Sequence, residues 1–113
     1  MPETIDQKLY PLVSIVLTTR NEERNVESCL LSVKCQSYPH EFLETIVIDN
    51  ASTDKTKEIA RRFTGQVFDK GPERSAQRNY GMVDIASGKY VMFVDADMVL
   101  APCLIQSCVD FMT

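Results

Sequence analysis

Alternation between apolar strand-like runs and helical segments most constrains how this chain of 113 residues can fold. Three runs are nearly continuous in apolar and β-branched residues, namely 12–19 (LVSIVLTT), 44–49 (ETIVID) and 90–94 (YVMFV), and a weaker strand is expected at 66–68. Runs of this kind are typical of buried strands, and the run at 12–19 suits a strand that is covered on both faces. Strands that alternate with helices join by right-handed crossovers, so the pattern predicts an α/β fold around a parallel sheet.

Four helices are expected between and after these strands, each from apolar residues at helical spacing. The first helix follows an N-cap at Asn25 and is expected to bury Val26, Cys29, Leu30 and Val33, and the second follows a cap at Ser52 or Thr53 and is expected to bury Ile59, Ala60 and Phe63. The third is expected over 75–87, with Ala76, Tyr80 and Val83 inward and Gly88 at its end. The last is an apolar helix over 103–111 that begins after Pro102.

Composition narrows the classes of function. The net charge is −4 and the basic residues are scattered, which argues against a nucleic-acid binder with a broad basic face. Apolar runs fall far short of the roughly 20 residues of a membrane helix, so no membrane segment is expected. Residues 1–11 contain acids and no apolar run; they are expected to be a flexible lead rather than a secretion signal, with one domain over 12–113.

The four cysteines are Cys29, Cys35, Cys103 and Cys108, and they show no CxxC spacing. Because they stand among apolar residues, they are expected to be buried reduced thiols, with metal binding or a disulfide as the alternatives. Reduced thiols predict a cytoplasmic protein.

Polar clusters follow each of the main strands. The first strand ends in TTRNEE, the second in DNAS and the last in DAD, residues 95–97. The carboxyl ends of parallel strands lie at one edge of the sheet, where α/β proteins bind ligands. Two carboxylates there, Asp95 and Asp97, repel each other unless a positive group lies between them, and a hard divalent ion prefers such oxygens. The alternative is that Asp95 caps a turn and Asp97 is solvated.

Three segments carry a resemblance to a known family. They are VSIVLTTRNEERNVESCLLSV, IVIDNASTDKT and SAQRNYGMVDIASGKYVMFVDADMVL, which together cover most of residues 12–100. In order and spacing they resemble the nucleotide-binding half of family 2 glycosyltransferases with the GT-A fold. The resemblance implies a Rossmann-like three-layer αβα architecture, a mostly parallel sheet in the order 3-2-1-4, and transfer of a sugar from a nucleoside diphosphate sugar to an acceptor hydroxyl.

The resemblance also implies roles for individual residues. Asp97 would hold Mn²⁺ or Mg²⁺, which grips the diphosphate. The donor-binding residues would be Thr18, Arg20 and Glu22 around the base and ribose, Asp49 and Asn50 at the base, Arg78 and Asn79 beside the diphosphate, and Asp95 at the ribose. Uracil is the first expectation for the base, although Asn50 stands where many members have aspartate. Each residue also has a purely structural explanation: Arg78, for example, could pair with Asp84 or Glu73.

The main departure from the family pattern is the missing acceptor-binding half. The chain ends sixteen residues after Asp97, so no catalytic general base is evident, and the chain alone is expected to be inactive in transfer. Two alternatives stay open. One is a non-catalytic nucleotide-binding or assembly module, and the other is a haloacid-dehalogenase-like phosphatase in which Asp95 would attack phosphate.

Self-association is expected through the last strand and helix. In the order 3-2-1-4 the strand at 90–94 lies at the edge, where an apolar strand is a template for pairing. The final helix is more apolar than one buried face requires. The alternative is that this helix covers the edge and leaves a monomer.

Overall fold

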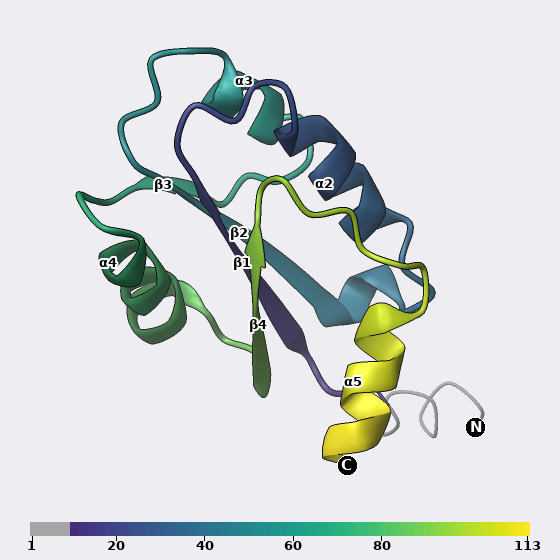
Figure 1. The fold of residues 1–113 in the computed structure, drawn as a ribbon. Helices are drawn as coiled ribbons and strands as arrows, with labels where there is room; N and C mark the ends of the chain where they lie inside the picture. The colour runs from purple at the N-terminus through teal and green to yellow at the C-terminus, as the bar shows by residue number, and fades with distance from the viewer. Residues whose placement is uncertain (1–9) are drawn as a thin grey trace.

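The computed structural model describes residues 10–113, which form a three-layer αβα domain (Figure 1). The strands are β1 (Val13–Thr19), β2 (Leu43–Asp49), β3 (Val67–Asp69) and β4 (Tyr90–Asp95). The helices are α2 (Val26–Lys34), α3 (Thr56–Ala60), α4 (Arg74–Asn79) and α5 (Leu104–Met112), with a short 3₁₀ turn at His40–Phe42. All strand pairs are parallel and the sheet order is β3-β2-β1-β4, which confirms the predicted fold class and strand order.

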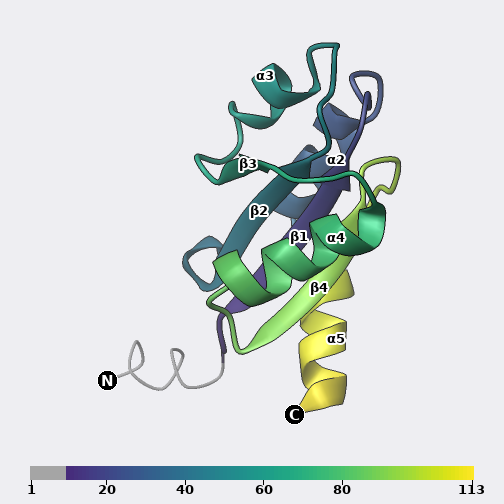
Figure 2. The same ribbon diagram turned by 90° about the vertical axis from the view of Figure 1, so that its left-hand side faces the viewer.

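The two faces of the sheet are covered by different helices (Figures 1 and 2). One face carries α2, α3 and α5, and its core contains Ile15 and Leu17 of β1 with Ile105 of α5. The other face carries α4 and a smaller cluster around Val16 and Ile48. Every residue of β1 is buried because β1 lies between two strands and two helical layers, as its continuous apolar run predicted.

The face that α4 presents to the sheet differs from the prediction. Val83 was expected to point inward, but its side chain is 70% exposed, whereas Gln77 and Gly81 are buried. After Asn79 the helix widens into a π-helical turn over Tyr80–Ile85, so helical spacing of 3.6 no longer tracks the buried side. Gly81 lies so close to β1 that a Cβ there would be 2.6 Å from Cγ1 of Val16, and this contact requires glycine.

The predicted helix caps are also wrong in detail. Asn25 makes no capping hydrogen bond at α2. Neither Ser52 nor Thr53 caps α3; instead, the carboxylate of Asp54 accepts from the backbone N–H of Thr56 at 3.0 Å. Gly88 does not end the third helix, which stops at Ile85.

The remaining sequence-based expectations concern the termini and the cysteines. Residues 1–9 of the expected flexible lead lie outside the described residues, and Tyr10 packs against Tyr38 with 5.4 Å between ring centroids. All four cysteines are free, but only Cys29 is buried, so the expectation that all of them are buried is wrong. Within residues 10–113, none of the helices has the length and apolar character needed to cross a bilayer.

Candidate functional site

A polar cleft lies at the carboxyl ends of β1 and β4, where the sequence predicted a ligand site. It has a volume of about 140 Å³ and is lined by Thr18, Thr19, Arg20, Glu22, Arg74, Gln77, Asp95, Ala96 and Asp97. Five of the predicted site residues are therefore brought together: Thr18, Arg20, Glu22, Asp95 and Asp97. The sheet register explains their convergence, because Thr18 in β1 pairs with Asp95 in β4.

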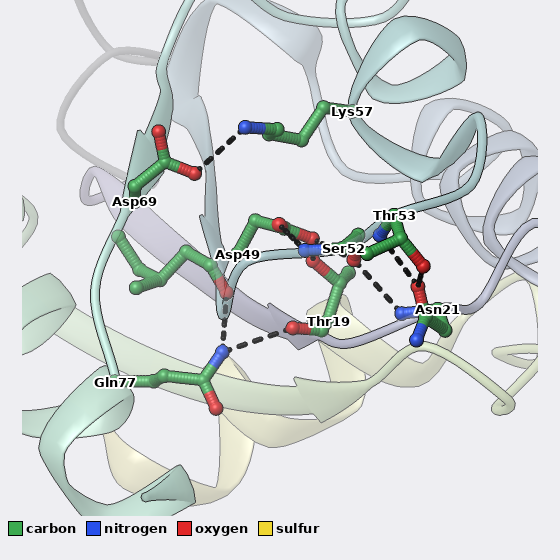
Figure 3. A network of polar contacts seen from close by, with 9 residues as sticks. Thr19, Asn21, Asp49, Ser52, Thr53, Lys57, Asp69 and Gln77 are labelled. Atoms are coloured by element: carbon green, nitrogen blue, oxygen red, sulfur yellow. Dashed lines mark hydrogen bonds and ion pairs between the residues drawn. The ribbon is translucent and has the colours of Figure 1, made fainter. Parts of the chain in front are cut away.

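The loop that follows β1 is fastened to the loop that follows β2 (Figure 3). Asn21 has a positive φ of 52°, which asparagine tolerates, and its backbone N–H donates to the Ser52 hydroxyl at 2.8 Å. Its side-chain oxygen accepts from the backbone N–H of Thr53 at 2.8 Å. The backbone N–H of the next residue, Glu22, donates to the Thr56 hydroxyl at 2.8 Å. These bonds fix the loop that carries the cleft-lining residues Arg20 and Glu22.

Asp49 is part of this internal framework rather than of the cleft wall. Its side chain is completely buried, and its carboxylate accepts from the Thr19 hydroxyl at 2.6 Å. It also accepts from the Ser52 hydroxyl at 2.6 Å and from the Ser52 backbone N–H at 2.8 Å (Figure 3). These three hydrogen bonds offset the free-energy cost of burying the carboxylate.

Two other predicted residues also lie away from the cleft lining. Asn50 is buried, and its side-chain N–H donates to the carbonyl of Pro72 at 2.6 Å, which ties the chain before α4 to the end of β2. Asn79 is exposed and lines a different hollow together with Lys70 and Tyr80. The structure thus places neither side chain with the acidic residues.

Arg78 pairs with Asp95, and not with Asp84 or Glu73. Its guanidinium donates to Oδ1 of Asp95 at 3.3 Å and lies 5.7 Å from the centre of the Phe93 ring. Both side chains of the pair are more than a third exposed, so this ion pair is worth little to folding. The ion pair orients Asp95 and offsets one of the two negative charges of the DAD motif, which reduces the repulsion between Asp95 and Asp97.

Asp97 is exposed, lines the cleft and makes no hydrogen bond or ion pair with the described residues. Glu22, Asp95 and Asp97 leave a negative field in this region. Burial first, and then these three carboxylates, raise the pKa of the Cys29 thiol to about 11. Cys29 is therefore a protonated, unreactive thiol at neutral pH.

The oxygen donors of this cleft suit Mg²⁺ or Mn²⁺. Within residues 10–113, however, no group of three His, Cys, Asp or Glu residues is arranged to hold an ion by itself. Magnesium is commonly held by one or two carboxylates together with the phosphates of a substrate, and Asp97 with Asp95 fits that arrangement.

Four of the nine residues that line the cleft were not among the predicted site residues, namely Thr19, Ala96, Arg74 and Gln77. Arg74 stands in a loop with Lys70 and Gly71 that could from the sequence either attract phosphate or be ordinary solvated charge, and the sequence favours the second; in the structure Arg74 lines the cleft. Gln77 gave no signal because a single glutamine on a helix has many explanations. Its side-chain N–H₂ donates to the carbonyls of Ile48 at 2.7 Å and Thr19 at 3.1 Å, which joins α4 to the ends of β2 and β1 (Figure 3).

Comparison with known families decides the assignment. Residues 14–113 match the family described as glycosyl transferase family 2. The chain belongs to this family. The resemblance inferred from the sequence motifs is confirmed, and the match gives no support to the phosphatase alternative.

Relatives and solved structures agree with this family assignment. The glycosyltransferase AglE of Haloferax volcanii is 37% identical over 94 residues, which cover 77% of this chain and 31% of AglE. The structure of S. aureus TarS in complex with UDP-GlcNAc aligns with a TM-score of 0.79 at 26% identity, over 89% of this chain and 31% of that one. The mannosyltransferase PcManGT from Pyrobaculum calidifontis, in complex with GDP-Man and Mn²⁺, aligns with a TM-score of 0.64 at 30% identity, over 77% and 28%.

These proteins are longer than the family 2 chain described here. The chain spans about a third to two-fifths of the length of the first relatives it matches and about a third of the first structure. The comparisons therefore establish the family and the GT-A fold for this domain.

Proposed function

We propose that this domain binds a nucleoside diphosphate sugar, with a divalent ion held between Asp97 and the diphosphate, for transfer of the sugar to an acceptor hydroxyl. The observation that carries the proposal is the exposed carboxylate of Asp97, without a partner among residues 10–113, in a cleft at the carboxyl ends of β1 and β4. The complexes of TarS with UDP-GlcNAc and of PcManGT with GDP-Man and Mn²⁺ support this class of ligand. They leave the base and the sugar open.

The residues of the cleft have separate roles in this proposal. Asp97 supplies a metal ligand, and Asp95, oriented by Arg78, faces the ribose or the ion. Arg20 and Arg74 add positive charge to the cleft, which favours an anionic donor. A divalent ion bound at this site would offset the charge that develops on the departing diphosphate. Asp49, Asn50 and the paired loops would act indirectly by fixing the shape of the cleft.

Calorimetry with UDP and with GDP tests the metal site. If Asp97 and the diphosphate share the ion, the nucleotide will bind more tightly with Mn²⁺ than with a chelator, by about 1–3 kcal/mol as is typical of linked sites. Asp97→Asn should remove the effect of manganese and keep the fold, because the side chain is exposed. Asp84→Asn is the matched control, since this exposed carboxylate lies outside the cleft. Equal affinity of the unmodified protein with and without manganese would contradict the proposal.

We further propose that the 113-residue chain binds the donor without transferring sugar by itself. Inverting transfer needs a base that deprotonates the acceptor. Glu22 already accepts from the Asn25 side chain at 3.1 Å, and Glu23 accepts from the backbone N–H of Lys55 at 3.1 Å. Incubation of the purified chain with donor, manganese and acceptor should give at most slow donor hydrolysis. Multiple turnovers onto an acceptor would refute this proposal and make Glu22 and Glu23 the first candidates for the base.

A further inference from the structure

Gln77 combines burial with an unused hydrogen-bond acceptor. The residue is 4% exposed, and its side-chain nitrogen donates to two backbone carbonyls, so the amide is held in one orientation. No donor among residues 10–113 bonds its side-chain oxygen Oε1, and this atom is not sealed from solvent. Gln77 also lines the cleft with Arg20 and Arg74. A buried amide with both N–H groups engaged leaves a fixed acceptor toward a ligand.

We infer that Oε1 of Gln77 accepts a hydrogen bond from the nucleoside of the bound donor and helps to select it. This inference rests on the proposed function and adds a specificity-determining residue to the same cleft. The acceptor oxygen repels phosphate oxygens, which leaves two kinds of partner: an N–H on the edge of the base or a hydroxyl of the ribose.

The position of Gln77 in the fold favours the nucleoside over the diphosphate. Its two carbonyl partners belong to β1 and β2, whereas Asp97 follows β4 on the other side of β1. Neighbouring strands lie about 4.8 Å apart, so the amide and the metal carboxylate are separated by roughly 5–10 Å along the edge of the sheet. A nucleotide whose diphosphate meets Asp97 therefore extends its nucleoside toward Gln77.

The orientation of the amide is protected by the fold itself. If the oxygen and nitrogen exchanged places, Oε1 would face the carbonyl oxygens of Thr19 and Ile48, and two buried acceptors would lose their donor. The chain thus dictates that the cleft meets an acceptor and not a donor at this point. Methionine at this position would keep the length of the side chain and lose the acceptor.

The test measures the affinity of Gln77→Met and of the unmodified chain for whichever of UDP and GDP binds the unmodified chain more tightly. Modified forms of that nucleotide each lose one donor: one is methylated at the ring N–H of the base, one is 2′-deoxy, one is 3′-deoxy and, if the nucleotide is GDP, one is inosine diphosphate, which lacks the exocyclic amine. We expect one of them to bind the unmodified chain about fivefold to tenfold more weakly than the parent nucleotide, and Gln77→Met to show no such difference. Gln106→Met, in α5, is the matched control and should behave as the unmodified chain does.

Outcomes separate this inference from the proposed function. If neither nucleotide binds the unmodified chain, both are refuted. If a nucleotide binds but all its modified forms lose the same affinity in both proteins, only the role of Gln77 is refuted. Should Gln77→Met fail to fold, the side-chain carbonyl carbon of Gln77 in the unmodified chain decides by NMR. Its resonance should shift on nucleotide binding more than those of Gln66 and Gln106, and an unchanged resonance would overturn the inference.

Discussion

Replacement of Asp49 by alanine should destabilise the domain strongly even though the residue lies outside the cleft wall. Asp49 is completely buried and accepts hydrogen bonds from the Thr19 hydroxyl, the Ser52 hydroxyl and the Ser52 backbone N–H. In Asp49→Ala the Thr19 hydroxyl, which is 2% exposed, and the Ser52 N–H would lose their acceptor.

Each buried donor without a partner costs about 1–3 kcal/mol. The Thr19 hydroxyl bears most of this cost because it is buried, whereas Ser52 is only half-buried, so its hydroxyl can turn toward water and its N–H bears a smaller cost. We therefore expect the free energy of unfolding to fall by roughly 3 kcal/mol, a large part of the 5–15 kcal/mol typical of a domain.

Urea unfolding followed by circular dichroism measures this change, and Asp69→Ala is the control. Asp69 ends the neighbouring strand β3 in register with Asp49, but it is exposed and forms only a surface ion pair with Lys57 at 3.0 Å. Its removal should cost less than about 1 kcal/mol. Adding Thr19→Val to Asp49→Ala should recover part of the loss, since it removes one stranded hydroxyl. Equal costs for Asp49→Ala and Asp69→Ala would refute the stabilising role of the buried carboxylate.

Two further predictions concern pH and assembly. Burial raises the pKa of Glu44, but hydrogen bonds from Ser14, Ser87 and Gln66 outweigh it and hold the pKa below its ordinary value of 4.5. The stability that Glu44 contributes is therefore present above about pH 4.5 and is lost as the pH falls through its folded-state pKa. The difference in free energy of unfolding between the unmodified chain and Glu44→Gln should shrink below pH 4.5, and a constant difference would contradict this prediction. Self-association through β4 and α5 stays a prediction, supported by the edge position of β4 and by Phe111, which is 90% exposed. Light scattering over a wide concentration range should show a dimer fraction that grows with concentration, and a monomer at every concentration would contradict this prediction.

The sequence determined the architecture of this domain because the architecture depends on local patterns. Continuous apolar runs predicted buried strands, which is confirmed for β1 but not for β4, where Phe93 is exposed at the edge of the sheet. The alternation of strands with helices predicted a parallel sheet. The rule that ligands lie at the carboxyl ends of such strands placed Thr18, Arg20, Glu22, Asp95 and Asp97 at one edge, where all five line the cleft.

Only the tertiary structure decided which polar residues of those motifs support the fold. The side chains of Asn21, Asp49 and Asn50 form hydrogen bonds between segments about 20–30 residues apart in the sequence. A linear motif does not show which partners lie across such distances. Gln77 shows the converse: its part in the cleft depends on two backbone carbonyls from different strands, which meet only once the sheet has formed. Buried polar groups must find partners wherever the packed chain brings them, so their roles follow from tertiary contacts rather than from spacing.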